Sequence, residues 1–264
     1  MHDSLPLSRR HEIAGRLRQG QPVSSGELAR EFGVSEDAIR RDLRALAAEG
    51  LCERVYGGAL PLSPAGAPLA SRAEEQPAAK AALAARAAEL VQPGQTIFLD
   101  CGSTTARLAS HLAAHLPQGS GLRVVTNSLP AATALSSRQD ISLFLLGGAV
   151  DPSIGGCVDG RALAELPRYA IDLCLLGACA LSPDGTLAGF DRADSDMKQA
   201  LLTASGATAL MMTSDKLGTR APFPFGAARA LTHLILEHDA PAEQLAALAS
   251  TGAPDPLRAA PPRS

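Results

Sequence analysis

Six short apolar runs recur from about residue 78 onward, and helix-like stretches or loops separate them. Strands with near-continuous apolar character that alternate with helices are typical of a parallel or mixed sheet covered on both faces. The alternation therefore predicts an α/β domain that opens with an Ala-rich helix at about 78–91. The expected strands are 96–99, 123–126, 142–146, 172–176, 208–212 and 232–236.

The first 58 residues lack this alternation and are predicted to form three short helices followed by a β-like ribbon. Ser8 is a candidate N-cap for the first helix, which we expect to reach about residue 19. Ser24 and Glu27 have the spacing of a capping box at the second helix, and Ser35 is a candidate cap for the third. Because a short turn around Gly33 joins these two helices, the sequence predicts a helix-turn-helix.

The third helix carries the argument for DNA binding. At about 100° per residue, Ile39, Leu43 and Leu46 share one face and are predicted to pack on the other helices. Arg41 and Arg44 point the opposite way, where guanidinium groups can read guanine or hold phosphates in a major groove. The predicted DNA-binding residues, with the helix caps and the ribbon included, are Ser24, Ser35, Asp37, Arg40, Arg41, Arg44, Arg54 and Tyr56.

The charge balance limits which kind of DNA binder this chain can be. The net charge is −3 with a pI near 6.1, and residues 1–60 hold nine Arg and nine acidic residues. No overall basic field exists to coat nucleic acid nonspecifically. A sequence-specific reader with arginines on one helix face fits this balance, and a helical interaction domain with a solvated charged face is the alternative.

Composition divides the chain further. A stretch rich in Pro, Ala, Gly and Ser at 59–77 is predicted to be a linker. The expected organisation is a DNA-binding domain at 1–58, that linker, an α/β effector-binding domain at 78–240, and a C-terminal helix with a disordered tail at 241–264.

Gly, Ser and Thr cluster where the predicted strands end. Backbone N–H groups at a helix start and nearby hydroxyls bind anions, and ligands of open α/β sheets bind at the carboxyl ends of the strands. The sequence therefore predicts a small-molecule site along that edge. The candidates are Asp100, Gly102, Ser103, Thr104, Thr105, Thr126, Asn127, Ser128, Gly147, Gly148 and Gly177.

Lysine is scarce: of 24 basic residues only Lys80, Lys198 and Lys216 are lysines. A lysine in an arginine background can mark a place that prefers a compact point charge. Lys216 follows a predicted strand, where it can reach a phosphate or hydroxyl. Lys198 is predicted to pair with Asp194 one helical turn earlier. Both are predicted to contact the effector, and the role of Lys80 stays open.

The sequence gives little support for metal binding, a cofactor or catalysis. His111 and His115 have metal-compatible spacing but no evident third ligand, so we expect no metal. We expect no cofactor and no catalytic residues. The five cysteines, with no CxxC pair, indicate reduced thiols. The first residues lack the apolar core of a secretory signal, and no apolar run reaches about 18 residues, so we expect a cytoplasmic protein without a membrane partner.

Two groups of segments resemble the DeoR family of bacterial transcription regulators across about residues 8–240. The N-terminal group is 34–43, 49–51 and 54–59. The C-terminal group is Lys80 with its helix, 100–105, 125–129, 146–148, Asp172 with 176–178, and Ser214 with Lys216. The resemblance implies a winged helix-turn-helix joined to a Rossmann-like α/β sensor domain, with the fold of ribose-5-phosphate isomerases and CoA-transferases. It implies an effector pocket lined by Asp100, Ser103, Thr104, Thr105, Asn127, Lys198 and Lys216.

The sequence departs from the family pattern in several places. Ala38 replaces a usual Thr in the DNA reader, so the operator sequence is not implied. Thr213 stands where the family often has Asp, Leu236 and Glu237 replace a common Thr-Asp pair, and 252–256 replaces the usual terminal strand. These differences leave the identity of the effector open.

The sequence thus predicts a repressor of a carbohydrate-metabolism operon that responds to a phosphorylated sugar or related metabolite. We expect a homodimer or homotetramer on double-stranded operator DNA, because one short recognition helix reads few base pairs. One alternative is a sugar-phosphate isomerase in which Asp100 and Lys216 perform acid–base chemistry. Another is a metabolite-binding protein without DNA binding. The effector, the operator and the sign of the response remain open.

Overall fold

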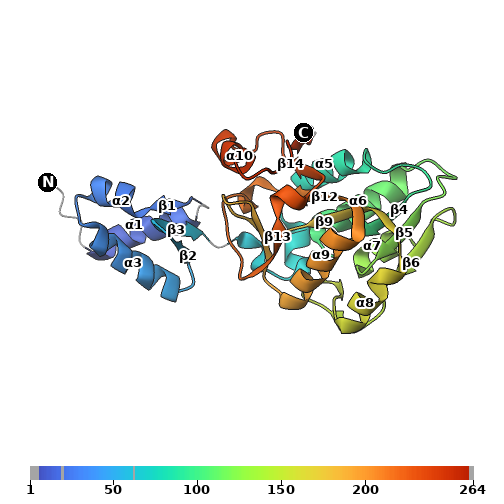
Figure 1. Cartoon of the computed structure of the whole chain (residues 1–264), viewed down its shortest axis with the longest axis horizontal. Coiled ribbons are helices and arrows are strands. Elements are labelled where there is room, and N and C mark those ends of the chain that lie inside the picture. Colours follow the sequence, from blue (N-terminus) through green and yellow to red (C-terminus); the bar gives the residue numbers. More distant parts are fainter. Residues whose placement is uncertain (1–5, 19–20, 62, 262–264) are drawn as a thin grey trace.

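A computed structural model of the chain describes residues 6–18, 21–61 and 63–261, and Figure 1 shows a small N-terminal part beside a larger one. The helices of the N-terminal part are α1 (Pro6–Arg18), α2 (Ser25–Phe32) and α3 (Glu36–Ala48). Its sheet, in the order β1-β3-β2, consists of β1 (Val23–Ser24), β2 (Cys52–Val55) and β3 (Gly58–Pro61). Because β2 and β3 form an antiparallel hairpin, this part is a winged helix-turn-helix.

The predicted capping residues define the N-termini of two of these helices, α2 and α3. The Ser24 hydroxyl accepts from the N–H of Glu27, and the Ser35 hydroxyl accepts from the N–H of Ala38. Gly33 adopts a left-handed φ of 65° directly after α2, which lets the chain turn into α3. The predicted cap at Ser8 is wrong: Ser8 lies inside α1, which already includes Pro6, a residue tolerated in a first helical turn. The predicted end of α1 near residue 19 lies outside the described residues.

The three helices pack through their apolar faces and one buried ion pair. Arg9 of α1 places Nη2 2.7 Å from Oδ2 of Asp42 in α3, and both side chains are less than a tenth exposed. A buried charge needs such a partner because burial removes its hydration. The pair therefore fixes α3 against α1. The buried apolar side chains of this core include Ile13, Leu17, Leu28, Ile39, Leu43 and Leu46.

A seven-stranded sheet forms the centre of the larger part, and all its neighbouring strands are parallel. The six predicted strands are all present, with ends shifted by at most three residues. In spatial order the sheet comprises β15 (Leu257–Arg258), β14 (His233–Leu236), β12 (Ser205–Met212), β9 (Ile171–Gly177), β4 (Thr96–Leu99), β5 (Arg123–Thr126) and β6 (Ser142–Leu145).

Helices cover both faces of this sheet. One apolar core gathers side chains from α5 (Pro77–Ala88), α6 (Ser103–His115) and α7 (Leu129–Leu135). The opposite core gathers them from α8 (Gly160–Glu165), η2 (Leu166–Arg168), α9 (Arg192–Ala204) and α10 (Ala242–Ala249). Successive residues of β4 serve the two cores in turn: Ile97 and Leu99 belong to the first and Phe98 to the second. This two-sided burial explains the continuous apolar runs.

Two small antiparallel sheets flank the parallel one. The first joins β10 (Ala180–Leu181), β11 (Thr186–Gly189) and β13 (Phe223–Ala227), and the second joins β7 (Val150–Asp151) to β8 (Gly156–Cys157). The remaining short elements are η1 (Pro64–Gly66), α4 (Leu69–Glu74), η3 (Ser214–Lys216) and η4 (Ala228–Ala230).

Two segments that we predicted to be irregular contain regular structure. The expected linker at 59–77 contains most of β3, then η1 and α4. The expected disordered tail supplies β15, because Leu257 pairs beside Ile235 and the Arg258 guanidinium donates to the Glu237 carbonyl at 2.9 Å. A terminal strand is therefore present directly after the divergent 252–256 segment. Within the described ranges, none of the helices is long and apolar enough to cross a membrane.

Candidate functional site

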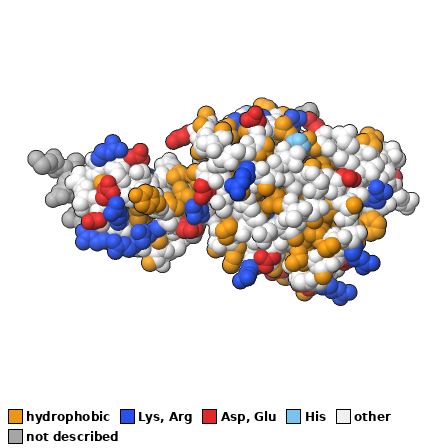
Figure 2. Space-filling view, in the orientation of Figure 1, with side chains coloured by type: hydrophobic (Ala, Val, Ile, Leu, Met, Phe, Trp, Pro, Cys, Tyr) orange, Lys and Arg blue, Asp and Glu red, His pale blue; other side chains and the backbone are white. Residues whose placement is uncertain are grey.

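The exposed face of α3 is the candidate DNA-reading surface. Arg41, Arg44 and Asp37 are exposed, while Ile39, Leu43 and Leu46 are buried, as the helical periodicity predicts. Figure 2 shows blue side chains, which in this part of the chain are all arginines, in a band over α3. Arg40 is exposed but already engaged, because its guanidinium lies 2.9 Å from Glu36 and 3.4 Å from Asp37. Arg41 and Arg44 are therefore the arginines of α3 that pair with no carboxylate of the described residues and are available to a DNA groove.

The β2–β3 hairpin is the candidate wing. Tyr56 at its tip is fully exposed, and Arg54 is exposed on β2. A Cβ on Gly58 would lie 2.0 Å from the Val23 carbonyl oxygen, so only glycine lets β3 pair with β1 at this point. The hairpin is thus held against the helices while its tip projects into solvent, where it can contact a DNA backbone.

A cavity of about 200 Å³ lies at the carboxyl ends of β4, β9 and β12, three adjacent strands of the parallel sheet. Ligands of open α/β sheets bind at this edge. Of the predicted effector-binding residues, the structure brings seven into its lining: Gly102, Ser103, Thr104, Thr105, Gly177, Lys198 and Lys216.

One side of this cavity suits an anion. Ser103, Thr104 and Thr105 form the first turn of α6, where backbone N–H groups are free of helical partners. The Thr105 hydroxyl is buried without a hydrogen-bond partner among the described residues. Lys216 of η3 is 9% exposed, and no carboxylate oxygen of the described residues lies within 4.0 Å of its Nζ. Burial lowers the pKa of Lys216 below its ordinary value, which is the condition of a cation that lacks an anion.

The other side of the cavity contains a charged cluster. Lys198 Nζ lies 2.9 Å from Oδ2 of Asp100 and also pairs with Asp194, as we predicted for the helical spacing of 194 and 198. Burial raises the pKa of Asp100 to about 6, against the opposing effect of Lys198. Burial lowers the pKa of Lys198, but the two carboxylates outweigh it and keep the ammonium charged. Asp100 is fully buried below the lining, so it supports the cavity without facing it.

The turns after β5 and β6 do not line the cavity, contrary to our prediction for Thr126, Asn127, Ser128, Gly147 and Gly148. The β7–β8 hairpin covers the first turn: the Cys157 N–H donates to the Asn127 carbonyl at 2.9 Å. The Thr126 hydroxyl donates to the Leu99 carbonyl, and the Ser128 hydroxyl caps α7.

The second turn packs on the start of α8. The Asp159 carboxylate accepts from the Ala149 N–H at 2.8 Å, and a Cβ on Gly148 would lie 2.4 Å from Oδ1 of the same carboxylate. The protein itself therefore engages both turns, although the side-chain amide of Asn127 is buried without a hydrogen-bond partner among the described residues.

The cavity also contains residues that we did not predict. Arg72 and 65–68 come from the expected linker, Ile154 comes from the turn of the β7–β8 hairpin, and Phe190 follows β11. Arg72 was the one cation in a Pro, Ala and Ser stretch, which is the only signal that the sequence offered. Lys80, whose role was open, is buried and donates from Nζ to the Arg72 carbonyl, so it joins α5 to α4.

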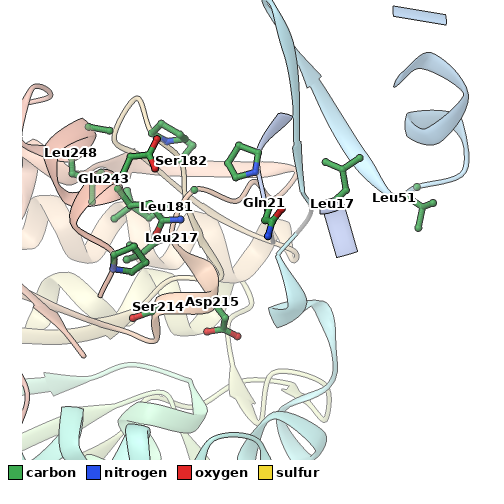
Figure 3. Close-up of a pocket in the computed structure, with 17 residues that line it drawn as sticks. Leu17, Gln21, Leu51, Leu181, Ser182, Ser214, Asp215, Leu217, Glu243 and Leu248 are labelled. Carbon is green, nitrogen blue, oxygen red and sulfur yellow. The ribbon is translucent and has the colours of Figure 1, made fainter. Parts of the chain in front are cut away.

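A second cavity, of about 1020 Å³, lies between the two parts of the chain. Figure 3 shows Leu17, Gln21 and Leu51 of the N-terminal part on one side, with Leu181, Leu217 and Leu248 of the larger part on the other. Its charged lining residues are Asp215 and Glu243, both acidic. This cavity is unsuited to an anion, so the smaller cavity is the candidate effector site.

His111 and His115, the pair with metal-compatible spacing, lie one turn apart on α6. His111 and His115 stack their rings at 4.3 Å, and across the described ranges no three His, Cys, Asp or Glu side chains gather in a metal-binding arrangement. All five cysteines are free thiols; Cys174 is fully buried, whereas Cys179 is only partly buried.

The fold and the two sites define a class: a winged helix-turn-helix DNA reader joined to an α/β sensor. Residues 9–64 match the DeoR-like helix-turn-helix domain and residues 75–238 match the DeoR C terminal sensor domain. The chain belongs to the DeoR family of transcription regulators.

Named relatives agree with this assignment. The glycerol-3-phosphate regulon repressor of Escherichia coli (strain K12) is 33% identical over 219 residues, which cover 83% of this chain and 85% of the relative. A putative aga operon transcriptional repressor of Escherichia coli O157:H7 is 26% identical and covers 92% of this chain and 91% of the relative. Among solved structures, ribose 5-phosphate isomerase A from Neisseria gonorrhoeae matches 53% of each chain at 15% identity with a TM-score of 0.39.

Proposed function

We propose that this chain represses an operon of carbohydrate metabolism and that a phosphorylated sugar or related metabolite modulates its binding to operator DNA. The observation that carries the proposal is Lys216, a buried ammonium without an ion-pair partner among the described residues, in the same cavity as the first turn of α6. A phosphate would satisfy both features, since it accepts hydrogen bonds from helix N–H groups and neutralises the lysine. A volume of about 200 Å³ favours a small metabolite.

The cluster opposite the anion side supplies the second half of recognition. Asp194 and Lys198 both line the cavity and offer an acceptor and a donor, which is what sugar hydroxyls require. The names of two relatives are consistent with such a ligand: one is a glycerol-3-phosphate regulon repressor and the other a putative aga operon transcriptional repressor. We therefore infer a ligand with a phosphate at the α6 end and hydroxyls at the α9 end.

For DNA we propose Arg41 and Arg44 as groove-reading residues, with Arg54 and Tyr56 on the wing. One α3 helix spans few base pairs, so we propose that two or four copies of the chain assemble to read paired half-sites. A regulator of this kind acts in the cytoplasm, and we propose that location.

We infer a binding site here, without catalysis. In the alternative isomerase, Asp100 and Lys216 would both have to reach the substrate, yet Asp100 is fully buried below the cavity that Lys216 lines. Turnover of pentose or hexose phosphates by purified protein would support the enzyme instead.

Thermal unfolding of the full chain with a panel of sugar phosphates, inorganic phosphate and the matching unphosphorylated sugars tests the proposed ligand class. A ligand at 100 times its Kd adds about 2.7 kcal/mol of stability. We expect one or more phosphorylated sugars to raise the Tm and the unphosphorylated partners to leave it unchanged. If no phosphorylated compound raises the Tm, or if the free sugars act equally well, the proposed ligand class is wrong.

A further inference from the structure

The segment between the wing and the sensor domain forms one wall of the candidate effector cavity. After β3 ends at Pro61, the chain passes through η1 to α4, and residues 65–68 and Arg72 face the cavity lined by Ser103 and Lys216. The cavity is therefore closed by a part of the chain that leads directly to the DNA-binding domain.

Arg72 is held in place at one end of its guanidinium. Its Nε donates to the Ala67 carbonyl at 2.8 Å, and Lys80 donates to the Arg72 carbonyl, so both the side chain and its backbone are anchored. No carboxylate oxygen of the described residues lies within 4.0 Å of the guanidinium nitrogens. Among the described residues, the N–H groups on the two terminal nitrogens of the Arg72 guanidinium therefore remain available to another acceptor.

Arg72 and Lys216 both line the candidate effector cavity and a smaller neighbouring one, and of these two Glu75 and Asp215 line only the smaller one. Arg72 lies near enough to contribute to lowering the pKa of Lys216, against the opposing effect of Asp215 and Glu75. In the effector cavity, which neither Glu75 nor Asp215 lines, an anion held between the two cations would offset their mutual repulsion. A guanidinium binds phosphate through two parallel hydrogen bonds, while an ammonium binds it as a point charge.

We propose that Arg72 is an effector-binding residue, and that its guanidinium holds the phosphate of the ligand together with Lys216 and the first turn of α6. This rests on the proposed function, and it assigns the phosphate to the side of the cavity that the interdomain segment provides. Ser63 lies on the same segment: its N–H donates to the Arg220 carbonyl at 3.2 Å and its hydroxyl donates to the carbonyl of Cys179, a lining residue. Arg72 thus belongs to the same interdomain segment as Ser63, which bonds to a residue of the cavity lining.

The test is calorimetric titration of the full chain with inorganic phosphate and with the sugar phosphate that gives the largest Tm shift. Arg72→Gln removes the charge and keeps an amide donor. Arg107→Gln is the matched control, because Arg107 is an exposed α6 residue that touches the same α4 segment through the Ala73 carbonyl and lies outside the cavity lining. We expect Arg72→Gln to weaken binding of both ligands about ten-fold or more, and Arg107→Gln to change it less than two-fold.

A measurement on the unmodified protein keeps the proposal testable if Arg72→Gln unfolds. Phenylglyoxal modifies accessible arginines, and mass spectrometry reports each site separately. We expect saturating ligand to protect Arg72 but not Arg107. If the wild type binds the sugar phosphate while Arg72 is neither protected nor needed for affinity, the assignment of Arg72 is overturned and the proposed function stands. If the wild type binds none of the phosphates, the proposed function itself fails.

Discussion

The ammonium of Lys198 lies 2.9 Å from Oδ2 of Asp100, and both side chains are almost completely buried at the candidate effector cavity, which Lys198 lines. Asp194, one turn earlier on α9, pairs with the same ammonium. The charged side chains of Asp100, Asp194 and Lys198 therefore link the end of β4 to α9 at the effector cavity. Such a cluster is stable only as a unit, because removal of the cation leaves two carboxylates facing each other in a buried site.

Lys198→Met is expected to lower the free energy of unfolding by about 3–5 kcal/mol, since it strands the buried Asp100 and Asp194 carboxylates. Urea unfolding followed by circular dichroism measures this loss. Arg192→Met on the same helix is the control: its guanidinium is exposed and lies 3.9 Å from Asp196, and an exposed pair contributes about 1 kcal/mol at most. Equal losses in the two variants would refute the structural role of the cluster.

Arg41→Ala and Arg44→Ala are each expected to weaken specific DNA binding by about 1–3 kcal/mol, roughly 5- to 150-fold, because these guanidinium groups are exposed and free of ion-pair partners among the described residues. Fluorescence anisotropy with a genomic fragment retained by the wild type measures the effect. Arg40→Ala is the matched control on the same helix, and we expect a smaller loss because Arg40 is already paired with Glu36 and Asp37. Unchanged footprints with Arg41→Ala would exclude α3 as the recognition helix.

Effector affinity should decrease at alkaline pH. Burial lowers the pKa of Lys216 below the ordinary value of 10.5, and an anion binds best to the charged ammonium. Affinity for the phosphate is therefore present at neutral pH and lost as the pH rises through the lowered pKa of Lys216. Titration calorimetry between about pH 7 and 10 measures this decline. The Lys216→Arg variant keeps its charge throughout, so its affinity should stay level; a decline of the same size in that variant would contradict the assignment.

Arg220 is expected to couple the two domains. Its guanidinium lies 3.5 Å from Glu53 of the wing strand β2 and 3.3 Å from Asp184, and its backbone bonds to the Pro61 carbonyl and the Ser63 N–H. Four residues earlier the same loop carries Lys216 into the cavity. Arg220→Ala should leave effector and DNA affinities within a few-fold of wild type but reduce the effect of effector on DNA affinity, which in allosteric proteins is typically about 5- to 150-fold. If Arg220→Ala leaves the effect of effector on DNA affinity unchanged, another contact between the two domains transmits the signal.

The sequence predicts the sheet well because its strands are buried on both faces and therefore form continuous apolar runs. It predicts the recognition helix equally well, since Ile39, Leu43 and Leu46 repeat at helical spacing. It fails for β15, because a two-residue strand such as Leu257–Arg258 gives too short a pattern to recognise.

Most of the cavity residues that the sequence predicts follow a strand, and Lys198, which lies on α9, is identified because lysine is scarce in this chain. Ser103 and Lys216 each follow a strand, and both line the cavity. Asn127 also follows a strand, yet the β7–β8 hairpin, made of two-residue strands, covers it. Arg72 belongs to a segment that precedes the whole sheet, and only tertiary packing returns it to the cavity.

The central claim is that one molecule both reads DNA and senses a phosphorylated sugar through the cavity at Lys216. The most direct measurement is anisotropy of a labelled genomic fragment bound by the full chain, titrated with the sugar phosphate that stabilises the protein. We expect the sugar phosphate to change DNA affinity, and Lys216→Met to abolish this response while specific DNA binding remains. DNA affinity that does not respond to any stabilising sugar phosphate, or a full response in Lys216→Met, would contradict this claim.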